Sequence, residues 1–309
     1  MRCLLSRHGI NTTKRENNMP ITQKQKESRS KHLGSSDIAA LLGVDPRRNA
    51  YDVWLDKTGK IEEPEENAAM FAGNMFEDGV LGFAEGQLGN LLRNQYRSAK
   101  DKNLPIGAHV DAIHIKTGNP VEAKTAGLYG PLMEPWGEPE TDEVPDRVII
   151  QSQVHMICTG AELCHVAAFI GGRGFQLYKV SKDATIQNII ADKAIDFWNN
   201  HVKADKPPEN ITPSYGVAKR IKRQPRTITD VSGQVVKNWI EAKGVFKDAK
   251  AARENAEAAL LAALGTAEGG VSIDGNITHY QQTRKPYSVK EGKYRVLRFT
   301  TKPLFQNKE

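Results

Sequence analysis

The sequence predicts an α/β fold in which a small mixed sheet carries helices on its flanks. Two observations predict it. Five short segments in which apolar and polar residues alternate lie between residues 94 and 180, and this period of two is typical of strands. Segments with helical spacing precede these five, interrupt them once and follow them. The predicted body spans residues 29–208.

Three helices are predicted before the strands. The first is short and begins at a cap supplied by Ser35, Ser36 or Asp37, since small polar side chains accept hydrogen bonds from the first turn of a helix. The second ends before Gly59. The third covers about residues 68–88, and its apolar side chains point to more than one face. We therefore expect this third helix to be largely buried.

The five predicted strands follow, several of them separated by glycine or Asn-Gly-type turns: residues 94–99, 107–115, 120–125, 166–170 and 175–180. An acidic, proline-bearing loop at 134–146 and a helix from about 146 to 159 come between the third and fourth strands. A long helix at 184–201 closes the body, and two prolines follow it at 207 and 208.

The two ends of the chain differ from this body. Residues 1–28 are polar, basic and unpatterned, and we expect a disordered extension. Residues 209–309 form a basic extension of mixed α and β character. In it we expect a linker at 219–226, an alanine-rich helix within 231–264, a hairpin around Asp274-Gly275 and a strand at 294–299.

Composition narrows the functional classes. The chain has 309 residues, of which 39% are hydrophobic and 26% charged, and no apolar run is long enough for a membrane-spanning helix. Three cysteines (Cys3, Cys158 and Cys164) cannot build a disulfide framework and suit a reducing cytoplasm. The net charge of +6 makes nucleic acid the first partner to consider.

That positive charge is unevenly distributed. Residues 1–33 carry a net charge of +6 and residues 209–309 a net charge of +8. Residues 34–208 hold 17 basic and 25 acidic side chains, a net charge of −8. An acidic body between basic flanks is either a solvated surface or a place where carboxylates are gathered for metal ions that in turn bind phosphate.

One local pattern carries chemistry: Asp111 is followed after ten residues by Glu122-Ala123-Lys124. Glu122 and Lys124 lie two apart on a strand and so face the same side, and a hairpin through Gly118-Asn119 would bring Asp111 beside them. Two adjacent carboxylates can hold a hard divalent cation, and a neighbouring ammonium can stabilise charge on a phosphate. These are the requirements of metal-assisted phosphodiester hydrolysis.

The alternative is a surface strand with alternating charges, whose ion pairs would contribute little. The context favours a site, because Asp111 lies among apolar residues and Glu122 lies between Val121 and Ala123. A carboxylate without a partner is costly in such surroundings. Glu77, an acid among large apolar residues, and Gln151 are candidates for the same cleft.

Four motifs in this order resemble the lambda-exonuclease-like, YqaJ-type viral recombinases of the PD-(D/E)XK nuclease superfamily, over about residues 29–203. They are the run from Gly34 to Gly43, Gly73-x-x-x-Glu77, Asp111-x10-Glu122-Ala-Lys124, and Gln151-x-Gln153 followed by Thr159-Gly160. The resemblance implies a restriction-endonuclease-like fold with a mixed central sheet. It also implies that residues 29–208 are the nuclease domain.

The resemblance further implies roles for single residues. Asp111 and Glu122 match the metal ligands, Lys124 matches the catalytic lysine, and Glu77 and Gln151 match supporting residues. The family also binds a 5′-phosphate through an arginine and a serine near the first helix. Residues at the matching positions, with two further basic candidates for DNA contact, are Arg29, Ser36, Arg47 and Arg48.

The activity implied is a Mg²⁺- or Mn²⁺-dependent exonuclease that degrades one strand of double-stranded DNA ends 5′ to 3′ during phage-type homologous recombination. The implied setting is the cytoplasm of a bacterial host, with a phage- or prophage-encoded chain, a homotrimer and a single-strand annealing partner. Two alternatives stay open. One is a RecB-type nuclease of other polarity or internal cutting, although an iron–sulfur version needs four cysteine ligands. The other is a non-catalytic DNA-binding protein that kept the fold.

Overall fold

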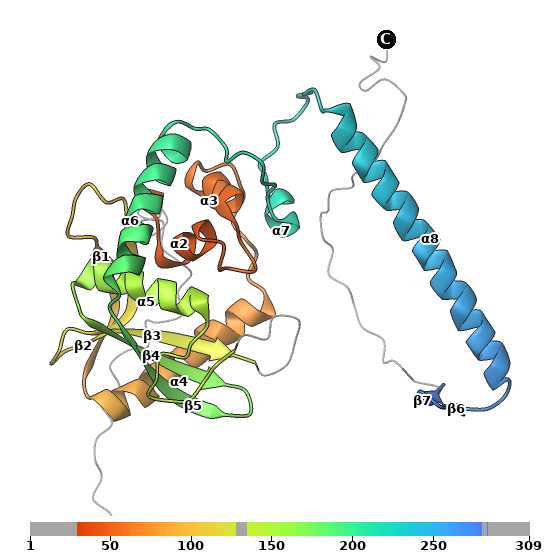
Figure 1. The fold of residues 1–309 in the computed structure, drawn as a ribbon, viewed down its shortest axis with the longest axis horizontal. Coiled ribbons are helices and arrows are strands. Elements are labelled where there is room, and N and C mark those ends of the chain that lie inside the picture. Colours follow the sequence, from red (N-terminus) through yellow and green to blue (C-terminus); the bar gives the residue numbers. More distant parts are fainter. Residues whose placement is uncertain (1–29, 128–134, 280–282, 284–309) are drawn as a thin grey trace, which may run out of the picture. The chain divides into compact units, whose positions relative to one another are not determined.

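A computed structural model describes residues 30–127, 135–279 and 283 and divides the chain into two compact units, Met1–Pro225 and Arg226–Glu309. The extension expected at 1–28 and the strand expected at 294–299 lie outside the described residues. The first unit contains α2 (Ser35–Leu41), α3 (Ala50–Lys57), α4 (Ala68–Leu88), β1 (Leu91–Ser98), β2 (Gly107–His114), β3 (Pro120–Ala126), α5 (Asp146–Thr159), β4 (Leu163–Ile170), β5 (Gly174–Ser181), α6 (Ala184–Phe197), the π-helical turn η1 (Trp198–Lys203) and α7 (Tyr215–Ala218) (Figure 1).

The five strands form one sheet in chain order, β1-β2-β3-β4-β5. Neighbouring strands are antiparallel except β3 and β4, which are parallel. A parallel pair needs a crossover connection, and α5 lies in that connection. The predicted α/β class, a mixed central sheet flanked by helices, is thus confirmed.

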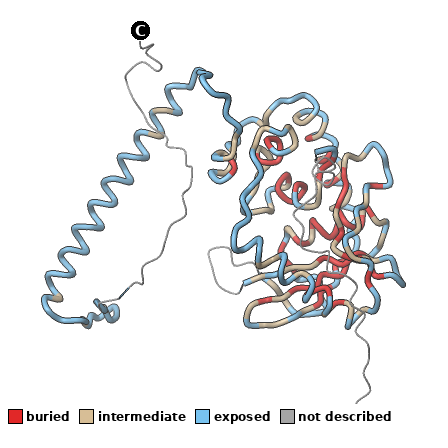
Figure 2. Tube along the Cα trace, turned by 180° about the vertical axis from the view of Figure 1, so that it is seen from behind, coloured by how far each residue is buried: buried red, intermediate tan, exposed pale blue. Residues whose placement is uncertain are grey.

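Helices cover both faces of the sheet. Val166 and Ala168 of β4 pack with residues of α5, whereas Ala167 between them packs with Val80 and Leu81 of α4. Because successive side chains of a strand point to opposite faces, α5 and α4 lie on opposite sides of the sheet. A third cluster joins α2, α3 and α6 to α5 and β2. Buried residues accordingly concentrate in the first unit (Figure 2).

The expectation that the third helix is largely buried is wrong. Only Val80, Leu81 and Ala84 of α4 are buried, and four large apolar side chains of its N-terminal half are 42% to 55% exposed: Met70, Phe71, Met75 and Phe76. The helical spacing shows that apolar side chains point in several directions, but it does not show which of them meet a neighbouring element. All three buried side chains lie in the C-terminal half, whereas in the N-terminal half Phe76 stacks on Phe169 of β4 and stays partly exposed.

The acidic loop expected at 134–146 covers the outer edge of β5. Glu140 donates its backbone N–H to Leu177 O at 2.8 Å, and Lys179 donates its own to Thr141 O at 2.9 Å. The side chains of Glu140 and Lys179 also form an ion pair. The loop therefore occupies hydrogen-bonding groups that an edge strand would otherwise expose.

The segment that follows η1 packs on the helices α2 and α3 within the first unit. Val217 of α7 is buried in the cluster of α2 and α3, and Ile221 forms an antiparallel bridge with Ile61. The linker expected at 219–226 is therefore paired over its first residues. The second unit contains α8 (Gly233–Leu264) and the two-stranded sheet β6 (Gly269–Ser272) and β7 (Gly275–Thr278), which confirms the predicted helix and the hairpin at Asp274-Gly275.

Among the described residues, no helix has the length and apolar character needed to cross a membrane.

Candidate active site

Asp111 and Glu122 meet where β2 and β3 separate. The two strands pair at Ala112 with Val121 and at Ile113 with Pro120, and one further step in this register places Asp111 opposite Glu122. The ladder does not continue there. Instead, Oδ2 of Asp111 accepts a hydrogen bond from the backbone N–H of Ala123 at 2.8 Å. The Asp111 side chain thus bonds to the neighbouring strand at the point where the two backbones diverge.

A tight turn sets this register. Gly118 has a φ of 77°, a left-handed conformation that glycine adopts without steric cost. Its N–H donates to His114 O at 2.8 Å, and the N–H of His114 donates to Asn119 O at 2.9 Å. The short connection between the two carboxylates, with its Gly-Asn pair, therefore forms the hairpin that the sequence predicts.

Glu122 and Lys124 share the α5 face of the sheet. Glu122 pairs in register with Val166 and Lys124 with Ala168, and both of these β4 residues pack toward α5. The Lys124 ammonium forms an ion pair with Oε1 of Glu122. A carboxylate and an ammonium therefore lie side by side next to Asp111, as the two-residue spacing predicts.

The pKa values of the two carboxyl groups are shifted in opposite directions. Burial, followed by the negative charge of Glu122, raises the pKa of Asp111 well above its usual value, although Lys124 opposes this. Burial would also raise the pKa of Glu122, but the positive charge of Lys124 and the neighbouring His155 and Arg147 lower it overall. Negative charge on both carboxylates is thus costly in the protein alone, and a bound cation would relieve that cost.

Three residues at four-residue spacing along α5 face the carboxylates. Nδ1 of His155 lies 3.1 Å from Oε2 of Glu122, although without hydrogen-bond geometry. Burial lowers the pKa of His155, although the negative charge of Glu122 opposes this. Gln151, one turn earlier, is buried, and its Oε1 atom has no hydrogen-bond partner among the described residues. Arg147, one further turn away, lowers the pKa of Glu122.

Sequence reasoning missed Arg147. Its spacing of four from Gln151, repeated at His155, was the available signal. Gln153 points elsewhere: it donates to Ser181 O at 2.8 Å and accepts from the backbone N–H of Asp183 at 3.1 Å. It therefore connects α5 to the start of α6 and lies apart from the carboxylates.

Glu77 reaches the same group from α4. It is half-buried, and its pKa is raised by burial and then by the charges of Asp78 and Glu122. The charge of Glu77 also raises the pKa of Asp111. The structure therefore brings Glu77, Asp111, Glu122 and Lys124 into electrostatic contact from three different elements.

The residues expected to bind a 5′-phosphate are distributed differently. Ser36 on α2 and Arg47 in the loop before α3 are exposed, and Arg29 lies outside the described residues. The Arg48 guanidinium is 3.1 Å from Asp37 and 3.4 Å from Asp56. Arg48 thus joins α2 to α3 through ion pairs, which sequence reasoning did not foresee.

The donor set fits a hard divalent cation. Mg²⁺ is usually held through one or two carboxylates and keeps several waters, and Asp111 and Glu122 supply two carboxylates, with one oxygen of Asp111 not used by Ala123. Among residues 30–127, 135–279 and 283, no group of three or more His, Cys, Asp or Glu side chains could hold a metal ion. A cation here would therefore depend on these two ligands and on water or phosphate oxygens.

Comparisons with known proteins place this arrangement in context. Protein YqaJ of Bacillus subtilis (strain 168) is 28% identical over 184 residues, which cover 58% of this chain and 56% of that relative. An alkaline exonuclease from Laribacter hongkongensis is similar in structure at 17% identity, over 60% of this chain and 94% of its own, with a TM-score of 0.45. A phage-related exonuclease from Haemophilus somnus is 11% identical over 58% of this chain and 99% of its own, with a TM-score of 0.42.

The matched family region contains the whole candidate site. Asp111, Glu122, Lys124, Gln151 and His155 all lie within residues 25–162, which match the family model of the YqaJ-like viral recombinase domain. Residues 25–162 of this chain thus match the same family that the motifs of the sequence resemble.

Proposed function

We propose that this protein is a divalent-metal-dependent exonuclease that acts on the ends of double-stranded DNA and hydrolyses one strand 5′ to 3′. One observation carries the proposal: the carboxylates of Asp111 and Glu122 meet where β2 and β3 separate, with Lys124 beside Glu122. Both the family assignment of residues 25–162 and the oxygen donor set support it.

In this proposal Asp111 and Glu122 hold Mg²⁺ or Mn²⁺, which when bound polarises a phosphate oxygen and lowers the pKa of water. Lys124 donates from its ammonium to the phosphate and stabilises the negative charge that develops during in-line attack. The Oε1 atom of Gln151, which is buried and has no hydrogen-bond partner within the described part of the chain, accepts a hydrogen bond from the attacking water and fixes its orientation. Glu77 is a further acceptor on the α4 side.

The finer features of the proposal come from the family. A 5′-phosphate would be held by Arg29 and Ser36, with Arg47 and Arg48 as nearby basic groups; of these, Arg48 is already engaged by Asp37 and Asp56. We further propose a role in phage-type recombination in the cytoplasm of a bacterial host, as a homotrimer working with a single-strand annealing protein.

The test is degradation of linear duplex DNA with Mg²⁺, comparing the wild type with Asp111→Asn and Lys124→Ala. Each substitution removes one charge from the site, so we expect a loss of activity of at least about 100-fold. Matched controls are Glu162→Gln and Lys182→Ala, which remove one charge each from an exposed ion pair. These controls should keep wild-type activity.

Further substrates resolve the finer features. Strands labelled at the 5′ or 3′ end report polarity, closed circular DNA reports internal cutting, and 5′-hydroxyl ends report the phosphate pocket. Full activity of both Asp111→Asn and Lys124→Ala would overturn the site. Release of label from the 3′ end first, or cutting of circles, would replace the proposed polarity or end dependence by the RecB-type alternative.

A further inference from the structure

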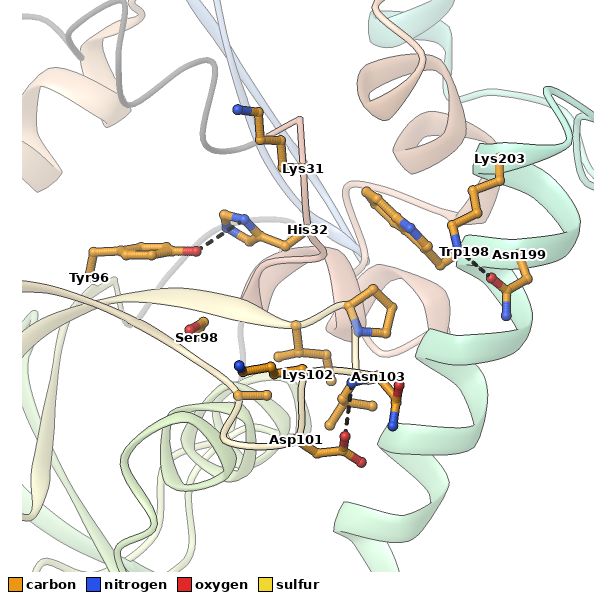
Figure 3. A pocket seen from close by; sticks show the side chains of 14 residues that line it. Lys31, His32, Tyr96, Ser98, Asp101, Lys102, Asn103, Trp198, Asn199 and Lys203 are labelled. Atoms are coloured by element: carbon orange, nitrogen blue, oxygen red, sulfur yellow. Dashed lines mark hydrogen bonds between the residues drawn. The ribbon is translucent and has the colours of Figure 1, made fainter.

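A cavity lies at the loop end of the β1–β2 hairpin. It has a volume of about 400 Å³ and opens between the hairpin loop, the residues before α2, and η1. Figure 3 shows Tyr96 and His32 on one side of it, Trp198 and Lys203 on the other, and Lys102 below.

This cavity is separate from the carboxylates. Ser98 on its wall pairs with Gly107 at the start of β2, four positions before Asp111. At about 3.3 Å per residue along a strand, this spacing corresponds to roughly 13 Å. Neither carboxylate of the candidate active site, nor Lys124, lines the cavity.

The cavity is basic although the body around it is acidic. Three lysines line it (Lys31, Lys102 and Lys203), against a single acid, Asp101. Oδ1 of Asp101 accepts a hydrogen bond from the backbone N–H of Asn103 at 2.9 Å, so this carboxylate stabilises the loop. Residues 34–208 as a whole carry a net charge of −8, and a local excess of lysines therefore attracts an anion to this place in particular.

The cavity also has an aromatic wall. Trp198 is half-buried and is the first residue of η1, where α6 changes to π-helical geometry. Such π-helical turns are rare and frequently occur at functional sites. On the opposite wall the Tyr96 hydroxyl lies 3.3 Å from Nδ1 of His32. Aromatic faces beside lysines are the combination that proteins use to bind nucleotides, through base stacking and phosphate contacts.

We propose that this cavity binds a nucleotide unit, with the base against Trp198 and the phosphate between Lys102 and Lys203. The unit is either part of a DNA strand or a released mononucleotide. The inference rests on the proposed function only in that DNA is the source of the ligand, and it assigns the protein a nucleotide contact apart from the catalytic carboxylates.

The experiment measures binding in EDTA, so that no strand is cut. A short 3′-labelled oligothymidylate is titrated by fluorescence anisotropy, and thymidine monophosphate by calorimetry, with the full-length protein. The variant Lys102→Ala/Lys203→Ala changes two exposed side chains, so it should fold normally. We expect at least about fivefold weaker binding of the ligand and, for the oligonucleotide, a salt dependence reduced by about 0.7 per lost phosphate contact.

The matched control is Lys116→Ala/Lys182→Ala, which removes the same charge from exposed positions outside the cavity and should bind as the wild type does. At the aromatic wall, Trp198→Phe keeps a stacking surface and Trp198→Leu does not. The Leu variant should lose about fivefold or more in affinity, and the Phe variant should retain most of it. Because Trp198 also packs on the core, thermal unfolding of both variants is recorded alongside.

The two probes distinguish the sources of the ligand. An effect on the oligonucleotide alone indicates a strand, and an effect on both probes indicates a site that also accepts the free mononucleotide. Equal affinities of wild type and Lys102→Ala/Lys203→Ala for both probes would overturn the inference, even if the wild type degrades DNA. Conversely, if these variants lose binding and the wild type has no nuclease activity, the inference that the cavity binds a nucleotide holds and the proposed nuclease function is rejected.

Discussion

Asp37 shows how a single residue organises the region before the sheet. Its carboxylate is 2.7 Å from the Lys57 ammonium and 3.1 Å from the Arg48 guanidinium, and it accepts the N–H of Gly34 at 2.8 Å. The side chains of Asp37 and Lys57 are only 6% and 5% exposed. Burial would raise the pKa of Asp37, but the positive charges of Lys57 and Arg48 outweigh it and hold this pKa well below its usual value.

Replacing Asp37 by Asn should therefore destabilise the fold strongly. The substitution removes the carboxylate charge from the buried pair with Lys57, and losing one member of a buried pair typically costs about 3–5 kcal/mol. Urea unfolding at pH 7, followed by tryptophan fluorescence, measures this cost. Glu162→Gln breaks the exposed pair with Lys182 and should cost less than about 1 kcal/mol.

The same pair gives a pH dependence of stability. A carboxyl group whose pKa is lowered in the folded state stabilises the protein above its unfolded pKa of about 3.9, and this contribution is lost as the pH falls toward the folded pKa. The difference in unfolding free energy between wild type and Asp37→Asn should accordingly be constant from pH 7 to 5 and shrink below about pH 4. A difference that stays constant down to pH 3 would contradict the pKa lowering of Asp37.

The two described cysteines should be chemically inert in the folded protein. Burial raises the pKa of Cys158 to about 12, and burial likewise raises that of Cys164, so almost no reactive thiolate exists at pH 8. In a Cys3→Ser variant, Ellman's reagent should detect no thiol before denaturation and both thiols after it. Rapid labelling of the native variant would show that these side chains are accessible.

At the scale of elements, the sequence predicted the strands because the signal is local. All five predicted strands are present. The ends of β2, β3 and β5 lie within one residue of the prediction, whereas β1 and β4 begin three residues earlier than predicted. The meeting of Asp111 with Glu122 was predictable for the same reason, since a short hairpin joins them. The approach of His155 to Glu122 was not, because it depends on how α5 packs over the sheet.

Two other features could not be predicted from the sequence for the same physical reason. The loop at 137–143 contains no strand pattern, yet its backbone pairs with β5, more than thirty residues later. The apolar side chains of α4 look alike in the sequence, although only Val80, Leu81 and Ala84 are buried. The periodicity of apolar residues depends on a single helix or strand. Burial and edge pairing depend on how two such elements meet in the fold, so the periodicity does not reveal them.

The edge pairing makes a prediction for Glu140. Its φ is 66°, which proline cannot adopt and glycine can, and its N–H donates to Leu177 O. Glu140→Pro should detach the loop and expose the Lys179 N–H, which donates to Thr141 O. Hydrogen exchange of peptides covering β5 should then be faster in Glu140→Pro and unchanged in Glu140→Gly. Equal protection in both variants would show that the loop does not hold this edge.

At the scale of the whole molecule, the boundary of the folded body lies later than the prolines at 207 and 208 suggest. The buried carboxylate of Asp52 accepts the N–H of Ser214 at 2.9 Å, and Asn49 donates to Thr212 O at 3.0 Å. Val217 fills part of the core, and the N–H of Lys222 donates to Lys60 O at 2.8 Å. Residues 209–225 are thus a structural part of the first unit.

Two truncations test this boundary. A chain ending at Pro225 keeps all three hydrophobic clusters and should unfold cooperatively with the stability of the first unit in the full chain. A chain ending at Pro208 loses the burial of Val217, worth about 1.5–3 kcal/mol, and leaves Asp52 without one partner, at a cost of about 1–3 kcal/mol. Urea unfolding should therefore show a loss of at least about 3 kcal/mol between the two chains. If both unfold with equal free energy, the contacts of residues 209–225 contribute nothing, and the body ends at the prolines.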